Sequence, residues 1–143
     1  MAVITRSATA EWHGSGKEGK GALTTQSGVL SATPYAANTR FGDTKGTNPE
    51  ELIAAAHAGC FSMSVAFALG RAGFTPTKIA TSAVLSLEPD DAGFKITKSA
   101  LKLEASVPNI DRAQFQEIAE GAKAGCPVSK VLNAEITLDW QLA

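Results

Sequence analysis

The chain has 143 residues, of which 44% are hydrophobic, so it has the size and composition of one folded domain rather than of a disordered segment. Thirteen Lys and Arg residues balance fourteen Asp and Glu residues, and the net charge of −1 argues against nucleic-acid and anionic-membrane binding. The two cysteines are too few for a disulfide scaffold or an all-cysteine zinc site. They suffice for one redox pair, and we predict a single domain over residues 1–143.

One stretch has the length of a membrane span. Residues 52–70 contain no Lys, Arg, Asp or Glu. Most of them are Ala, Gly, Ser, His or Cys, so the stretch predicts a helix that is buried in a soluble protein and apolar nearly all round. Residues 1–7 lack the apolar core of a signal peptide. We therefore expect a cytoplasmic protein with no membrane contact.

The first third of the chain predicts a β-hairpin followed by a loop. Strand-like residues 5–12 and 22–27 flank a turn at 14–21 that is rich in Gly and Lys. Residues 31–46 show no clear periodicity and contain Pro, Asn, Gly and Asp. We predict that they form a long loop, and long ordered loops often carry function.

A long helix is predicted next. The run Thr47-Asn48-Pro49-Glu50-Glu51 contains a helix start, with either Asn48 or Thr47 as the N-cap. Proline at the first helical position fits the former choice, but the pattern leaves both registers open. Gly73 predicts that the helix stops near Arg71.

The second half of the chain alternates strands and helices. We predict strands at 79–88 and 93–106, a helix at 112–124 capped by Asp111, a short helix at 126–132 and a closing strand at 134–142. The order ββ–α–ββ–α–β indicates an α+β fold in which antiparallel sheets cover a buried helix.

The two cysteines have different settings. Cys60 lies in the middle of the predicted long helix, where a free cysteine usually behaves as a small buried hydrophobic residue. Cys126 directly precedes Pro127 and a short helix, whose free N–H groups favour a thiolate. A reversible disulfide between them suits a cytoplasmic protein better than a permanent one. The alternative is a ligand-binding or structural dimer with two unrelated core thiols.

A metal site is a weaker interpretation. His57 and Cys60 share a helical face, and His13 and Cys126 could add ligands, but this spacing matches no standard zinc site. His57 can equally be a core histidine with satisfied hydrogen bonds. We therefore predict no metal and no cofactor.

Four stretches of the sequence are similar to the OsmC/Ohr family: Thr39-Arg40-Phe41, Gly46-Thr47-Asn48-Pro49-Glu50-Glu51-Leu52, Ala54-Ala55-Ala56-His57-Ala58-Gly59-Cys60-Phe61-Ser62-Met63 and Lys123-Ala124-Gly125-Cys126-Pro127-Val128-Ser129. The likeness runs from Trp12 to the C-terminus, and the separation of the second and fourth stretches makes them specific together. The resemblance implies an OsmC-like fold, with antiparallel sheets around a long central helix, in an intertwined homodimer whose sites lie at the subunit interface.

The resemblance also implies a thiol peroxidase that reduces organic hydroperoxides and, more weakly, hydrogen peroxide. It assigns Cys60 as the peroxidatic thiolate and Cys126 as the resolving thiol, with a lipoyl-type dithiol as the reductant. The resemblance also implies a helper Arg–Glu pair, which corresponds to Arg40 and Glu50. From the residues alone, Arg40 can be a solvated loop side chain and Glu50 an acid that complements the helix dipole. The early hairpin offers lysines where the Ohr branch has its arginine, which favours the OsmC branch.

The spacing of Glu50 and Cys60 adds a geometric expectation. They are ten residues apart, which in one helix is a rise of about 15 Å. A glutamate side chain cannot span that distance, so Glu50 cannot serve the Cys60 of its own chain directly. Two antiparallel copies that cross near 54–56, a run of alanines in a chain with 25 of them, would bring Glu50 of one chain beside Cys60 of the other. We therefore predict a composite site that requires a homodimer.

Overall fold

The structure is a computed structural model that describes residues 2–143, and the chain divides into two compact units, Met1–Leu52 and Ile53–Ala143. Each unit contains one three-stranded sheet. The assignment of residues 1–143 to a single domain stays a prediction.

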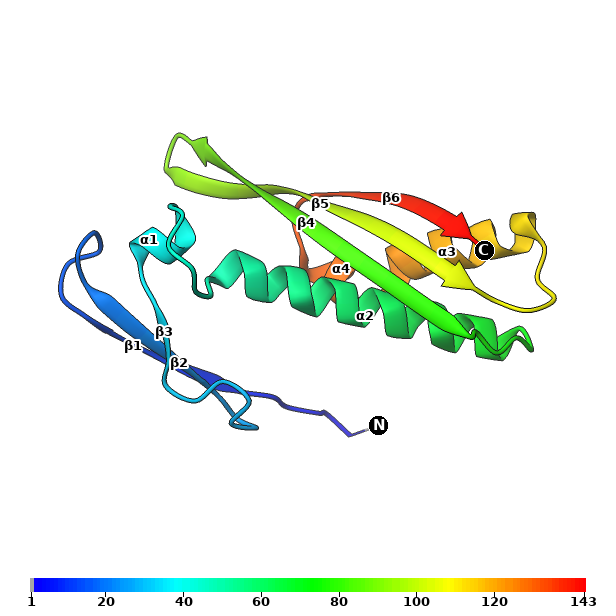
Figure 1. Cartoon of the computed structure of the whole chain (residues 1–143), viewed down its shortest axis with the longest axis horizontal. Helices are drawn as coiled ribbons and strands as arrows, with labels where there is room; N and C mark the ends of the chain where they lie inside the picture. Colours follow the sequence, from blue (N-terminus) through cyan, green and yellow to red (C-terminus); the bar gives the residue numbers. More distant parts are fainter. Residues whose placement is uncertain (1) are drawn as a thin grey trace. The chain divides into compact units, whose positions relative to one another are not determined.

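The first unit contains the predicted hairpin and two elements that the sequence analysis missed. Strands β1 (Ala8–His13), β2 (Lys20–Thr25) and β3 (Thr33–Tyr35) form an antiparallel sheet in that order, and the short helix α1 (Ala37–Arg40) follows (Figure 1). The prediction of a loop over residues 31–46 was therefore wrong for β3 and α1. A three-residue edge strand that contains a proline leaves almost no periodicity in the sequence.

Helix α2 (Pro49–Arg71, 23 residues) confirms the predicted long helix and settles its start. The Asn48 Oδ1 atom accepts a hydrogen bond of 2.8 Å from the Glu51 N–H, so Asn48 is the N-cap. The Thr47 hydroxyl instead donates to the Glu51 carboxylate at 3.0 Å. Beyond the helix, Gly73 has a φ of 89°, which is the left-handed conformation that ends many helices.

Only one face of α2 is covered in the single chain. Its buried residues recur every four positions: His57, Phe61, Val65 and Leu69. On another face, the side chains of Met63 and Phe67 are 60% and 61% exposed. By length and composition α2 passes the test for a membrane span, which core helices of globular proteins also pass. The expected burial nearly all round is therefore not reached in one chain, because its own sheet packs on one side of the helix.

The second unit is built on a mixed sheet. Strands β4 (Lys78–Asp90) and β5 (Gly93–Ser106) pair antiparallel, whereas β6 (Glu135–Leu142) pairs with β5 in parallel. The purely antiparallel sheet that we expected is corrected here. The connection from β5 to β6 runs through helices α3 (Arg112–Gly125) and α4 (Pro127–Val131), which carry the chain back before β6 begins.

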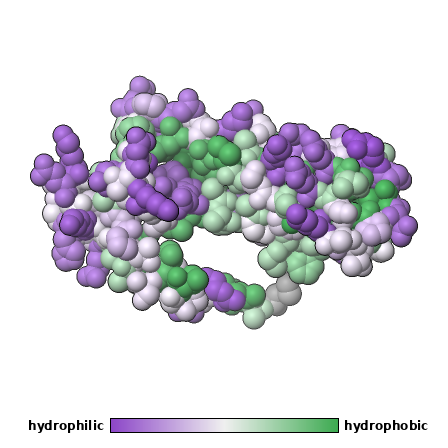
Figure 2. All heavy atoms as spheres, in the orientation of Figure 1, coloured by the Kyte–Doolittle hydropathy of each residue, from purple (hydrophilic) through white to green (hydrophobic). Residues whose placement is uncertain are grey.

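Helices α2 and α3 pack on the same face of this sheet (Figure 1). The core joins three elements through fully buried side chains, among them Phe61 of α2, Leu103 of β5 and Phe115 of α3. In β5, the buried leucines alternate with the exposed Lys102 and Glu104, so this part of the strand has one buried and one solvent-exposed face. Hydrophilic side chains cover the turn between β4 and β5 (Figure 2). The α+β class with a long central helix is confirmed.

The start of α3 offers a test of local stability. The Asp111 carboxylate accepts a 2.8 Å hydrogen bond from the Gln114 N–H, which caps the helix. We expect Asp111→Ala to lower the free energy of unfolding by about 1 kcal/mol, because an N–H at the helix start loses its partner. Asp111→Asn keeps an acceptor and should stay close to wild type. Urea unfolding followed by circular dichroism measures both, and an equal loss in the two variants would contradict the cap.

Candidate active site

Two cysteines from distant parts of the sequence lie side by side. The sulfur atoms of Cys60, on α2, and Cys126, between α3 and α4, are 2.8 Å apart, and both residues are free thiols. A disulfide bond is about 2.0 Å long, so a shift of less than about 1 Å would join them. Cys126 is completely buried, whereas Cys60 is partly exposed. A reagent in solution therefore reaches Cys60 first.

The position of Cys126 follows from the proline after it. Cys126 ends α3 and begins α4, with an extended backbone at φ −60° and ψ 128°. A proline disfavours the helical conformation in the residue before it and is well tolerated at the first position of a helix. Pro127 therefore breaks the helical run at Cys126 and turns the chain, and the thiol is placed in the core.

The surroundings shift the two thiol pKa values in opposite directions. Burial raises the pKa of Cys60, and the interaction with Cys126 raises it further. The Val128 N–H and the Ser64 hydroxyl lower the pKa of Cys60, but not enough to reverse that rise. Burial also raises the pKa of Cys126, but the Cys60 side chain, the N–H groups at the start of α4 and the Ser129 hydroxyl outweigh it, so this pKa lies below its ordinary value. Within the second unit, Cys126 is therefore the more easily ionised thiol.

A buried histidine adjoins the cysteine pair. His57 is fully buried, with its Nδ1 atom 2.7 Å from the Ser99 hydroxyl and its Nε2 atom 2.8 Å from the Ser129 hydroxyl. Burial lowers the pKa of His57, so the ring is neutral at pH 7 and carries one N–H group. The core-histidine interpretation of His57 is confirmed. Among residues 2–143 no group of three or more His, Cys, Asp and Glu side chains is placed to hold a metal.

An arginine and a glutamate form the second cluster, in the first unit. The Arg40 Nε and Nη2 atoms donate to the Glu50 Oε1 and Oε2 atoms at 2.9 and 3.0 Å. The Glu50 carboxylate raises the pKa of Arg40 against the lowering effect of burial. Such a two-point fork fixes the plane of the guanidinium and uses two of its five N–H groups. Neither residue is merely solvated.

Hydrogen bonds between α1 and the start of α2 hold this pair in place. The Thr39 hydroxyl donates to the Thr47 carbonyl at 2.9 Å, and the Asn48 side-chain amide donates to the Thr39 carbonyl at 3.0 Å. Arg40 is the last residue of α1 and Glu50 lies in the first turn of α2. The runs at 39–41 and 46–52, which resemble the family, are therefore joined by hydrogen bonds that orient the Arg–Glu pair.

The structure thus brings together Arg40 with Glu50, and Cys60 with Cys126. Sequence reasoning missed the serines that surround the cysteines. Ser129 carried a usable signal, because it follows the Cys-Pro pair by a spacing that fits the first turn of a helix. No pattern near Ser99 or Ser64 distinguished either from other serines.

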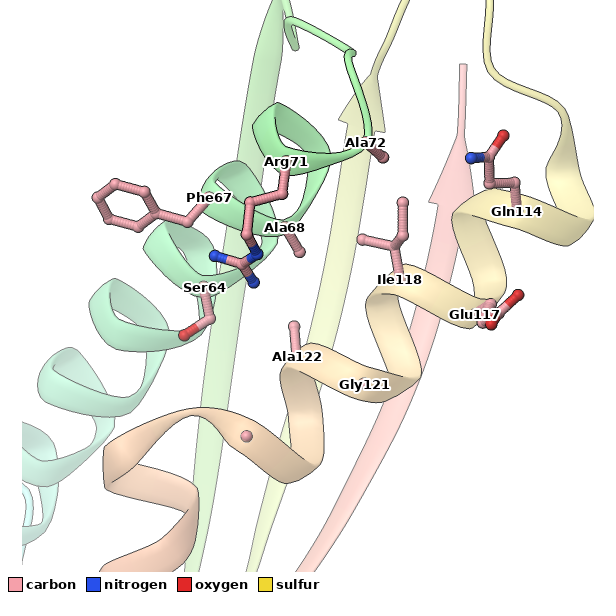
Figure 3. A pocket seen from close by; sticks show the side chains of 11 residues that line it. Ser64, Phe67, Ala68, Arg71, Ala72, Gln114, Glu117, Ile118, Gly121 and Ala122 are labelled. Atoms are coloured by element: carbon pink, nitrogen blue, oxygen red, sulfur yellow. The ribbon is translucent and has the colours of Figure 1, made fainter.

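A groove of about 600 Å³ lies between the second half of α2 and α3 (Figure 3). It begins beside the cysteines, since Ser64 is one turn beyond Cys60 and Gly125 adjoins Cys126. Ala68 and Ile118 line its walls, and the guanidinium of Arg71 extends back along α2 toward Ser64. The groove therefore offers apolar walls beside the thiol pair, and its lining also includes the charged side chains of Arg71 and Glu117.

Two thiols within bridging reach, one partly exposed and one buried with a lowered pKa, define a dithiol redox protein on an α+β scaffold. A profile of the family described as OsmC-like protein matches residues 42–141. Peroxiredoxin OsmC of Escherichia coli is 60% identical over 140 residues, which cover 98% of each chain. The chain belongs to the OsmC family.

More distant relatives support the same family assignment. The organic hydroperoxide resistance protein OhrB of Bacillus subtilis is 29% identical over 143 residues and covers 99% of each chain. The crystal structure of an OhrB of the same organism matches with a TM-score of 0.69 at 28% identity, covering 99% of this chain and all of that one. The OsmC/Ohr resemblance read from the sequence is confirmed.

The sulfur geometry predicts that the pair is oxidised within one chain. Treatment with diamide should form a disulfide between Cys60 and Cys126 with little change in the far-UV circular dichroism, because the sulfur atoms need to move by less than about 1 Å. Non-reducing peptide mapping identifies the bridge. Cys126→Ser is the control, and it should stay without an intrachain bridge. A bridge between two chains in the wild type, in place of the intrachain one, would contradict the geometry.

Proposed function

We propose that this cysteine-based peroxidase reduces organic hydroperoxides to alcohols, and hydrogen peroxide more weakly, with Cys60 as the attacking thiolate and Cys126 as the resolving thiol. The observation that carries the proposal is the 2.8 Å separation of a partly exposed and a buried sulfur. The names of its relatives, a peroxiredoxin and hydroperoxide resistance proteins, support the substrate class.

The reaction has two steps on the protein. The Cys60 thiolate attacks the distal oxygen of the hydroperoxide, the O–O bond breaks, and the alkoxide takes a proton to leave as the alcohol. Cys60 is then a sulfenic acid. The Cys126 thiolate attacks this sulfur, the S–O bond breaks, and the departing hydroxide takes a proton to leave as water. The pair ends as a disulfide, which protects Cys60 from further oxidation.

Arg40 and Glu50 supply the charge that Cys60 lacks in its own unit. Because burial raises the pKa of Cys60, the thiolate needs a nearby cation at neutral pH. The Arg40 guanidinium, held by the two-point fork from Glu50, can stabilise the thiolate and donate to the peroxide. The fork fixes the guanidinium before the substrate arrives, so little ordering is needed during the reaction.

A second copy of the chain brings the two clusters together. Glu50 and Cys60 lie ten residues apart on the continuous helix α2, which corresponds to about 15 Å along its axis. The exposed apolar face of α2 includes Ala55, Gly59, Met63 and Phe67, and its small residues permit a close helix crossing. An antiparallel crossing of two α2 helices covers this face and completes both sites by symmetry.

The apolar groove beside the cysteines suits the carbon chain of an organic hydroperoxide. Its volume of about 600 Å³ falls in the range of small-molecule sites. Hydrogen peroxide has no apolar group to bury there, so its binding gains less from the site. This difference explains why the bulkier substrate is preferred.

An external dithiol closes the cycle. Its thiolate attacks the partly exposed Cys60 sulfur of the disulfide, because Cys126 is completely buried. Cys126 leaves more readily as a thiolate because its pKa lies below its ordinary value. A lipoyl-type dithiol fits, since it is small enough to approach and its second thiol releases the mixed disulfide. Free thiols between turnovers agree with a cytoplasmic location.

Single-cysteine variants test the assignment of roles. Cys60→Ser should lose hydroperoxide reduction completely, because no other thiol reaches the substrate. Cys126→Ser should consume about one equivalent of cumene hydroperoxide and then stop, with Cys60 trapped as a sulfenic or sulfinic acid. Peroxide consumption and intact-protein mass spectrometry measure both. A wild-type protein that binds ligands but leaves hydroperoxide untouched would support the ligand-binding dimer instead.

Mixed dimers test whether Arg40 acts across the interface. Cys60→Ser and Arg40→Ala homodimers should each have little activity. After the two are mixed and allowed to exchange subunits, about a quarter of the wild-type activity should return, because half of the dimers are mixed and each of these has one intact site. A mixture of the Cys60→Ser and Glu50→Gln dimers should recover activity to the same extent. If Arg40 served its own chain, no mixture would recover activity.

A further inference from the structure

We propose that the Ser129 hydroxyl, oriented by His57 and Ser99, prepares Cys126 for the step that closes the disulfide. The inference rests on the proposed roles of the two cysteines. It gives a role to the buried imidazole of His57, which takes no part in the proposed peroxidase reaction. Ser129 follows the resolving thiol in the first turn of α4, and His57 and Ser99 act as positioning residues.

The chain of contacts runs from β5 through His57 to the first turn of α4, which Cys126 begins. Ser99 lies 2.7 Å from the Nδ1 atom of His57, and Ser129 lies 2.8 Å from the Nε2 atom. His57 and Ser99 are completely buried and Ser129 is 7% exposed, so water does not compete for these bonds. Ser129 stands in the first turn of α4, three residues after the Cys126 that begins this helix, and its hydroxyl and N–H lower the pKa of Cys126.

The neutral charge of His57 couples the directions of its two hydrogen bonds. A neutral imidazole donates from one nitrogen and accepts at the other, so only one of the two serines can donate to it. When Ser99 donates to Nδ1, the Nε2–H group donates to the Ser129 oxygen. The Ser129 hydrogen is then free to point at Cys126. This arrangement leaves each of the three polar side chains satisfied and places one hydroxyl donor on the thiolate.

The network can also reverse. If the imidazole carries its hydrogen on Nδ1, it donates to Ser99, and the Ser129 hydroxyl donates to the bare Nε2 atom. The sulfur then loses this donor, which suits a protonated Cys126 or a disulfide, since neither needs stabilisation of negative charge. The number of protons in the network is the same in both arrangements. The serines and His57 therefore adapt to the state of Cys126 without a buried charge.

The step that benefits is the attack on the sulfenic acid. The Cys126 thiolate forms the S–S bond with Cys60, the S–O bond breaks, and hydroxide leaves with the proton that Cys126 gave up, as water. A hydroxyl donor raises the fraction of Cys126 that is ionised at neutral pH. The titratable groups that face Cys126 are Cys60, which is consumed as the sulfenic acid, and His57 behind Ser129, which stays neutral.

A single-turnover experiment separates this step from the first one. The reduced full-length enzyme is mixed with one equivalent of cumene hydroperoxide, and peroxide loss and bridge formation are followed separately by rapid quench and mass spectrometry. In Ser129→Ala, peroxide loss should stay within about twofold of wild type. Bridge formation at pH 7 should slow about tenfold, the effect of removing one hydrogen bond to a charged group. The deficit should shrink as the pH rises, because hydroxide then ionises Cys126 without the serine.

Matched variants distinguish this role from a structural one. Ser62→Ala removes another serine hydrogen bond of α2, the 2.7 Å contact with the Thr81 hydroxyl, and should leave bridge formation unchanged. Ser129→Thr keeps the hydroxyl and should retain most of the rate. Ser99→Ala should slow bridge formation less than Ser129→Ala does. It provides a second test of the network if Ser129→Ala folds poorly.

The outcomes separate the two proposals. Unchanged bridge formation in Ser129→Ala, or a deficit that stays constant from pH 6 to pH 9, about the range in which thiols titrate, would overturn the role of Ser129 and leave the peroxidase assignment intact. A wild-type enzyme that consumes no hydroperoxide would overturn the proposed function and, with it, this inference.

Discussion

The contact between Cys60 and Cys126 depends on how α2 packs against the end of α3. Phe61, next to one cysteine on α2, and Ala122, one turn before the other on α3, belong to the same buried core, so hydrophobic packing sets the sulfur separation. A close-packed interior resists movement of either helix. A disulfide between these two sulfur atoms would therefore need only a small local shift, without rearrangement of the fold.

Much of the architecture could be predicted because short-range interactions determine it. Side-chain caps at Asn48 and Asp111 fix where two helices begin, and the glycine at 73 fixes where the long one ends. The parallel pairing of β6 depends on the path of α3 and α4 through space, which the alternation of residues in a strand does not encode. The short strand β3 was missed because it is too short to show the residue alternation of a strand.

The residues of the candidate site also divide into those that the sequence indicates and those that only the fold reveals. The cysteines, Arg40 and Glu50 could be found because runs of neighbouring residues resemble a known family. Ser99 reaches His57 across 42 positions of sequence through the β5 register, and no local pattern records that approach. Long-range pairs of common residues such as serine therefore become visible only in the folded chain.

The raised pKa of Cys60 has a consequence for the chain before it meets a partner. A thiol that is protonated at neutral pH reacts slowly with peroxides, because the thiolate is the nucleophile. A newly made chain would thus carry a protected cysteine through folding. In the proposed dimer, reactivity would appear only when the Arg40 guanidinium of the second chain reaches Cys60. In the proposed dimer, assembly would therefore control reactivity, and a monomer would neither consume reductant nor become irreversibly overoxidised at Cys60.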